Sequence, residues 1–277
     1  MLTVIGDLVA DLIVLGGDRL ARGTDNPAEV RLTRGGSAAN VAAAAAGRHS
    51  VRFIGRVGAD TLGETLAHEL AATGVDVRVQ RQGRTGAIVI LVDDDGERTM
   101  ITDRGAAAEL DAIEPTWLDD SERVHFPLYG FADAGSRSAL IEAAGALRSR
   151  GIPISLDLSS TATMRLLGSA ALSSLIDALA PDVVFANADE AALVTEFGLA
   201  VGDVYVVKRG GDPVLLTTHG VTTEVRVDRE DVVDSTGAGD AFAAGYLVAI
   251  LEGADPQRAA RAGCDLACTA LRRAGAL

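Results

Sequence analysis

The chain has 277 residues, of which 48% are hydrophobic, and it carries a formal net charge of −14. This apolar content is sufficient for a buried core and excludes an intrinsically disordered chain. The acidic balance excludes nucleic acid and anionic membrane surfaces as main partners, although backbone amides and a bound cation could still hold an anionic cosubstrate.

Strand-like and helix-like segments alternate along the first two-thirds of the chain. The predicted strands cover residues 2–5, 51–54, 87–92, 123–126, 153–156, 183–185 and 204–207, and the predicted helices cover 38–47, 61–73, 135–150 and 188–195. Alternation of this kind predicts an α/β fold in which helices cover both faces of a mostly parallel sheet.

Two segments interrupt this alternation. Residues 14–34 are rich in glycine and charge without a helical period, and residues 87–102 resemble a β-hairpin. Together they predict a small β lid, formed from about 12–34 and 84–104, that closes over the edge of the sheet. Since no repeat or low-complexity linker divides the chain, we expect a single domain over residues 1–277.

Three sequence features concern cellular location, metal binding and disulfide formation. No basic stretch leads into a long apolar run, and no run reaches the ~18 residues of a membrane span, so we expect a soluble, cytoplasmic protein. The four histidines show no ligand spacing and predict no zinc site. Cys264 and Cys268 share a face of the predicted last helix, where we expect small buried hydrophobic side chains and not a disulfide.

The segment Asp234-Ser-Thr-Gly-Ala-Gly-Asp240 carries the strongest chemical signal. It lies between a strand-like stretch at 222–227 and a helical run at 241–251. Its glycines would expose backbone N–H groups to an anion at a helix N-terminus, and its last aspartate would place a proton acceptor beside that anion. This combination can transfer a phosphoryl group to a hydroxyl. Taken alone, the same residues also fit a tight turn with an N-cap.

Polar residues follow other predicted elements. Asp7 and Asp11 come after the first strand, at the sheet edge where open α/β folds bind ligands. The pair Gly35-Gly36 opens a helix from which Asn40 would point back toward a ligand. Because the segment lacks the pattern G-x-G-x-x-G and a following acidic residue, it does not indicate a dinucleotide site.

Asn187 and Glu190 follow another strand and lie on one face of the first helical turn. Two interpretations stay open: oxygen ligands for a hydrated Mg²⁺, or an N-cap with its capping box. The chain has no G-x-x-x-x-G-K-[ST] sequence, which excludes a Walker A loop.

In this order and spacing, the motifs resemble the signatures of the ribokinase-like (PfkB) carbohydrate kinase family. Gly35 to Asn40 resembles the N-terminal signature, and Asp234 to Asp240 resembles the C-terminal one, D-[ST]-x-G-A-G-D. The resemblance extends from residue 2 to about 276. It implies a ribokinase-like, three-layer α/β/α fold with a β lid, and transfer of the γ-phosphoryl group of ATP to a sugar hydroxyl.

The resemblance also implies roles for individual residues. Asp240 matches the family's catalytic base, and Gly237, Ala238 and Gly239 match its anion hole. The other implied roles are Mg²⁺ organisation by Asn187 and Glu190, substrate binding by Asp11, Gly35, Gly36 and Asn40, nucleotide binding by Asn187, Lys208, Gly210, Gly237 and Gly239, and K⁺ binding by the carbonyls of Asp234 and Thr236. An exposed β lid would also suit a homodimer.

Two segments bear on substrate choice. Arg104 closes the second hairpin strand, where it resembles an arginine that pairs with the carboxylate of a sugar acid; a solvated loop arginine is the alternative. The segment 191–207 is shorter than in relatives such as ribokinase, which alters the wall beside the adenine site.

Two other functions compete with a sugar kinase. A nucleoside kinase of the adenosine type would need aromatic side chains to stack the base; residues 14–34 contain none, but Phe126, Tyr129 and Phe131 could supply them. A sugar-binding regulator without turnover should have lost the base or the anion hole, and this chain retains both.

Overall fold

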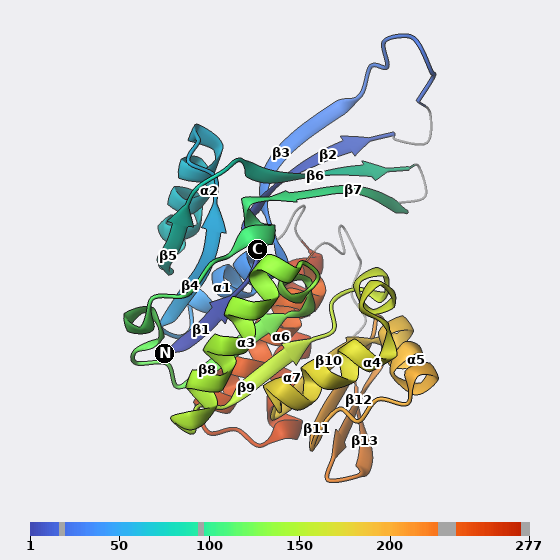
Figure 1. The fold of residues 1–277 in the computed structure, drawn as a ribbon. Coiled ribbons are helices and arrows are strands. Elements are labelled where there is room, and N and C mark those ends of the chain that lie inside the picture. The colour runs from blue at the N-terminus through green and yellow to red at the C-terminus, as the bar shows by residue number, and fades with distance from the viewer. Residues whose placement is uncertain (17–19, 94–96, 227–236, 273–277) are drawn as a thin grey trace.

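The computed structural model describes residues 1–16, 20–93, 97–226 and 237–272, and within them a main sheet of nine strands is sandwiched between helices (Figure 1). In spatial order the strands are β13 (Val221–Val225), β12 (Asp212–Thr218), β11 (Val204–Arg209), β10 (Val183–Asn187), β9 (Ile154–Asp157), β8 (Arg123–Pro127), β1 (Leu2–Ile5), β4 (Val51–Val57) and β5 (Asp76–Arg81). The helices are α1 (Ser37–Ala46), α2 (Thr61–Ala72), α3 (Ala134–Ser149), α4 (Thr161–Leu179), α5 (Ala188–Phe197), α6 (Ala238–Leu251) and α7 (Pro256–Leu271).

The main sheet is parallel from β5 through to β11, and only the pairs β11–β12 and β12–β13 are antiparallel. Strands β8, β9 and β10 are buried almost throughout, as expected of parallel strands covered on both faces. The predicted α/β class, with a mostly parallel sheet between two helical layers, is confirmed.

Two hydrophobic clusters hold the layers together. Helices α1, α2, α6 and α7 pack on one face of the sheet, around Phe53, Phe185 and Tyr246. Helices α3, α4 and α5 pack on the other face, around Phe126 and Phe131. Each of these aromatic side chains is fully buried, which contributes roughly 1.5–3 kcal/mol apiece to folding.

A second sheet of four strands stands over one end of the main sheet (Figure 1). Its order is β3 (Glu29–Gly35), β2 (Val9–Leu15), β6 (Thr85–Val92) and β7 (Arg98–Gly105). Side chains alternate between its faces, so Ile88 and Ile90 line a cavity while Leu32 and Ile101 lie on the opposite face. These strands overlap the segments expected to form a lid, although β2 begins three residues earlier, at Val9. That the sheet moves as a lid stays a prediction.

Two helices differ from the sequence-based expectation. Helix α4 was not predicted, because Gly168 interrupts it with a positive φ of 74° and its sequence is rich in Ser, Thr and Gly. Helix α6 begins at Ala238, three residues before the predicted start, since Gly237 adopts the left-handed conformation that caps it. No helix in the described part of the chain combines the length and the apolarity of a membrane span.

Candidate active site

A cavity of about 890 Å³ lies beyond the carboxyl ends of the central strands and beneath the second sheet. Its polar lining includes residues at or just after the ends of β1, β9 and β10 and at the starts of α1 and α6. In open α/β sheets this edge is where strands end and helices begin, so side chains distant in sequence converge there.

The first turn of α6 points its backbone into this cavity. Gly237 is the N-cap with φ 71°, and Ala238, Gly239 and Asp240 are the first three helical residues. No side chain of a described residue caps this terminus, which leaves its amides available to an anion. The Nζ atom of Lys208 approaches within 3.4 Å of where a Cβ on Gly239 would lie, so a cation adjoins the same turn.

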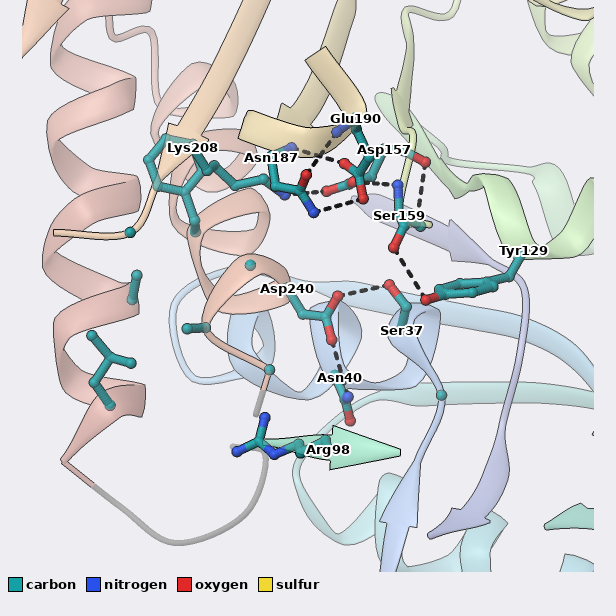
Figure 2. A pocket seen from close by; sticks show the side chains of 18 of the residues that line it. Ser37, Asn40, Arg98, Tyr129, Asp157, Ser159, Asn187, Glu190, Lys208 and Asp240 are labelled. Carbon is teal, nitrogen blue, oxygen red and sulfur yellow. Dashed lines mark hydrogen bonds and ion pairs between the residues drawn. The ribbon is translucent and has the colours of Figure 1, made fainter. Parts of the chain in front are cut away.

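Asp240 is held by two side chains of α1 (Figure 2). Ser37 Oγ donates a hydrogen bond of 2.6 Å to Oδ1, and Asn40 Nδ2 donates one of 3.0 Å to Oδ2. Arg34 in turn donates to Asn40 Oδ1 at 3.2 Å and so fixes the amide orientation. Burial raises the pKa of Asp240 to about 6, although both hydrogen bonds oppose the rise. This carboxylate is therefore oriented, ionised at neutral pH and more basic than an ordinary aspartate.

Asp11 faces the same cavity from β2. Its side chain is buried, and its Oδ1 has no hydrogen-bond partner among the described residues. A Cβ on Gly35 would come within 2.2 Å of this carboxyl group, and one on Gly36 (φ 100°) within 2.4 Å of the Asp7 carbonyl oxygen, so both positions require glycine. Burial raises the pKa of Asp11 to about 6. An unsatisfied acceptor in a cavity suits a ligand hydroxyl.

Asn187 and Glu190 form a capping box at the start of α5 and also line the cavity. Glu190 N donates to Asn187 Oδ1 at 2.9 Å, and Asn187 N donates to Glu190 Oε2 at 2.8 Å. The pair therefore forms the capping box, and its place on the cavity wall is also compatible with a role in binding Mg²⁺. Burial, followed by the charge of Asp157, raises the pKa of Glu190 to about 7.

Asp157 was not singled out from the sequence, although it ends β9 as Asn187 ends β10. Its Oδ2 accepts a hydrogen bond of 2.6 Å from Lys208 Nζ (Figure 2). Mg²⁺ prefers oxygen ligands that carry negative charge. The side chains of Asn187, Glu190 and Asp157 therefore fit a cation. Among the described residues, no group of three or more His, Cys, Asp or Glu could hold a metal, so water and phosphate would have to complete its shell.

Arg104 lies on the cavity wall with both ends of its guanidinium engaged. Its Nε and Nη2 donate to the two carboxylate oxygens of Asp7 at 2.9 and 2.6 Å, and its Nη1 donates to Asp133. With 11% of its side chain exposed, on strand β7, it is not a solvated loop arginine. The pairing with a substrate carboxylate stays a prediction, and these contacts favour an internal role instead.

The far end of the cavity is apolar. Helix α7 contributes Cys264 and Cys268 to its lining, and Lys208 and Gly210 also line the cavity. The side chains of both cysteines are buried, as expected, but their position on the cavity wall was not foreseen. Burial raises the pKa of Cys264 to about 11, so its thiol stays protonated.

The other residues that the sequence singled out lie in the core, on the cavity wall or outside the described residues. Phe126 and Phe131 belong to the core, whereas Tyr129 lines the cavity and donates to the Ser159 carbonyl at 3.1 Å. Asp234 and Thr236, expected to bind K⁺, lie outside the described residues.

Known proteins resemble this chain over its whole length. The family model for pfkB family carbohydrate kinases matches residues 1–277. An ATP-dependent ribose-1-phosphate kinase of Halopiger xanaduensis is 34% identical over 263 residues, which cover 89% of this chain and 84% of that protein. A fructokinase of Salmonella typhimurium is 30% identical over 266 residues, covering 89% and 83%. The crystal structure of adenosine kinase from Sinorhizobium meliloti superposes with a TM-score of 0.87 at 26% identity, covering 99% of this chain and 94% of that one.

Proposed function

Because this chain belongs to the pfkB family of carbohydrate kinases, we propose that it moves the γ-phosphoryl group of ATP to a hydroxyl of a small sugar or sugar acid, with Asp240 as general base. The observation that carries the proposal is the position of Asp240 in the first turn of α6, beside uncapped amides and facing the cavity. A base and an anion cradle thus occupy one helical turn.

Asp240 takes the proton of the attacking hydroxyl. Ser37 and Asn40 hold its two oxygens, so the carboxylate has one orientation before the acceptor arrives. A pKa of about 6 matches the task, since the group is ionised at neutral pH yet basic enough to accept a proton in the transition state.

The amides of Ala238, Gly239 and Asp240 stabilise charge on the transferring phosphoryl group. Lys208 adds a positive charge next to Gly239, and Gly210 leaves room for the nucleotide at the end of β11. The side chains of α7 that line the cavity would suit the adenine ring.

Asn187, Glu190 and Asp157 would hold Mg²⁺ through oxygen atoms and water. When bound, Mg²⁺ neutralises phosphate charge as the phosphoryl group departs. The carboxylates of Glu190 and Asp157 would orient the cation, and Lys208 forms an ion pair with Asp157 beside it. A requirement for K⁺ through Asp234 and Thr236 remains part of this proposal.

Asp11, Asn40 and the glycine pair Gly35-Gly36 form the acceptor site. The free Oδ1 of Asp11 would accept a hydrogen bond from a second substrate hydroxyl and so present the reacting one to Asp240. A nucleoside is the second candidate, because Tyr129 lines the cavity and could stack a base. A screen for ADP release with hexoses, pentoses, sugar acids, sugar phosphates and nucleosides tests the sugar-kinase and the nucleoside-kinase proposals. If no acceptor led to ADP release, the proposed kinase activity would be refuted.

The second sheet would serve as the lid and as a dimer surface. Its outer face exposes Val30 (56%) and Leu32 (60%) on the edge strand β3, and Ile101 (59%) on the opposite edge strand β7. Such an apolar face suits a second copy of the same sheet. Sedimentation of the wild type against Leu32→Asp tests it: a dimer that survives the substitution would contradict this interface.

A further inference from the structure

Ser37 occupies the place that an acceptor hydroxyl must reach. It is the first residue of α1, and its Oγ donates to Asp240 Oδ1 at 2.6 Å. An acceptor has to donate its proton to the same carboxylate, and the other oxygen, Oδ2, already accepts from Asn40. In the absence of an acceptor, Ser37 is therefore the hydroxyl that the base holds.

The same hydroxyl faces the anion cradle. Ser37 lines the cavity together with Gly237 and Gly239, and Asp240 belongs to the same helical turn as those glycines. Figure 2 shows Ser37 reaching from α1 toward Asp240, across the cavity from Lys208. The Ser37 hydroxyl, the Asp240 carboxylate and the amides at the start of α6 therefore lie close together, which is the arrangement that a kinase needs for the hydroxyl of its acceptor.

Two other hydroxyls of the cavity have different partners. Ser159 Oγ donates to the Asp157 carbonyl at 2.9 Å, and Tyr129 donates to the Ser159 carbonyl. Among the described residues, Ser37 has the only hydroxyl group that hydrogen-bonds to Asp240, which makes the geometry selective for a single side chain.

We propose that Ser37 is phosphorylated by the enzyme's own active site when ATP is bound without an acceptor. The inference rests on the proposed function. A bond forms between Ser37 Oγ and the γ-phosphorus, the bond from that phosphorus to the β–γ bridging oxygen breaks, Asp240 takes the hydroxyl proton, and ADP leaves.

The modified residue would block the enzyme. A phosphoserine carries about −1.5 to −2 charges, and here it would fill the acceptor's place between Asp240 and Asp11. The N-terminus of α1 offsets part of the repulsion from these two carboxylates. Because Ser37 is tethered to a helix and not free to align, we expect it to react about 10²-fold or more slowly than an acceptor.

The sequence makes the site simple to map. Trypsin cleaves after Arg34 and Arg48, and the peptide 35–48 contains Ser37 as its single hydroxyl residue. The protein is incubated with Mg²⁺ and ATP labelled in the γ position, without an acceptor, and the peptide is analysed by mass spectrometry. Phosphate is expected on peptide 35–48 of the wild type and of Ser37→Thr, and absent from Ser37→Ala and Asp240→Asn.

A functional readout accompanies the mapping. Preincubation with Mg²⁺ and ATP should lower the later turnover of the acceptor in proportion to the label in the wild type, and leave the rate of Ser37→Ala unaffected. Ser174→Ala, which changes an exposed serine of α4, is the matched control and should label like the wild type.

The outcomes separate the inference from the proposed function. ADP release with an acceptor but no phosphate on peptide 35–48 would overturn the inference and leave the kinase standing. Label that persists in Asp240→Asn would assign it to another kinase and also overturn the inference. If neither label nor ADP release occurred with any acceptor, both proposals would fail.

Discussion

Lys208 Nζ lies 2.6 Å from Asp157 Oδ2, and Lys208 is the single lysine of a chain with 25 basic side chains of Lys and Arg. Burial alone would lower the pKa of this ammonium, but Asp157, Glu190 and Asp240 together outweigh it and the pKa rises. The lysine is thus held charged between two acids, Asp157 and Glu190, and beside the start of α6.

The first prediction removes this charge. Lys208→Met should raise the KM for ATP and lower kcat, and it should cost about 3 kcal/mol of stability because Asp157 is left buried and unpaired. Lys208→Arg is the control: it keeps the charge and should recover most of the stability but less of the activity. Steady-state kinetics and urea unfolding provide the measurements. Wild-type kinetics in Lys208→Met would remove Lys208 from the nucleotide site.

The second prediction concerns the base. Asp240→Asn should reduce kcat by about 10²–10⁴ while the acceptor KM changes far less, since the carboxylate acts as the proton leaves. Asp133→Asn, on a more exposed carboxylate that contacts Arg104, serves as the comparison and should keep most of kcat. A kcat within a few-fold of the wild type in Asp240→Asn would refute the base assignment.

The third prediction follows from the pKa of Asp240, which burial raises to about 6. A base must be ionised, so kcat/KM should fall as the pH drops through about 6 and level off above it. Ser37→Ala removes a hydrogen bond that favours the ionised form, so the acid limb should move to higher pH. The pH–rate profiles of both proteins give the result, and an unmoved limb would mean that another group titrates.

Much of this site was predictable because each motif lies at the end of a strand or the start of a helix. Asp240, Asn40 and Glu190 could be placed by local pattern alone. Ser37 could not, because its contact with Asp240 joins positions 203 residues apart, and no local pattern encodes that pairing. Asp157 was missed for a related reason: its strand was predicted to end one residue before it.

Arg104 illustrates a different limit. The sequence placed it at the end of a hairpin strand, and from there it could point to a substrate, to solvent or to the body of the protein. Its partners Asp7 and Asp133 lie in two other segments that only the folded chain brings together. The fold class depended on alternation along the chain and was recoverable, whereas side-chain partners depend on tertiary geometry.

The fourth prediction concerns stability as a function of pH. His125 is fully buried on β8, and its Nδ1 forms a hydrogen bond of 3.0 Å with Ser155 Oγ. Burial lowers the pKa of this imidazole from 6.5 to about 4. The unfolded chain therefore binds a proton between these values while the native protein does not, so stability falls as the pH drops from about 6.5 to about 4. The loss should reach about 3 kcal/mol.

The measurement is urea unfolding across that pH range. His125→Leu should flatten the dependence whatever its effect on stability at neutral pH, and His68→Gln, on the exposed face of α2, should leave it unchanged. An equally steep loss in His125→Leu would attribute the pH dependence to other groups.

The fifth prediction decides whether Arg104 serves the fold or the substrate. Arg104, on β7 of the second sheet, pairs with Asp7 just after β1, and both side chains are about nine-tenths buried. Arg104→Ala should therefore lower the free energy of unfolding by about 3–5 kcal/mol, because the Asp7 carboxylate is left unpaired. Removing both partners in Asp7→Ala/Arg104→Ala should cost less than the sum of the single changes, because no buried charge remains. If Arg104 acts internally, Arg104→Ala should raise the KM of neutral and acidic acceptors by similar factors. A loss confined to acidic acceptors would instead assign Arg104 to a substrate carboxylate, and additive stability changes would show that Asp7 and Arg104 are not coupled.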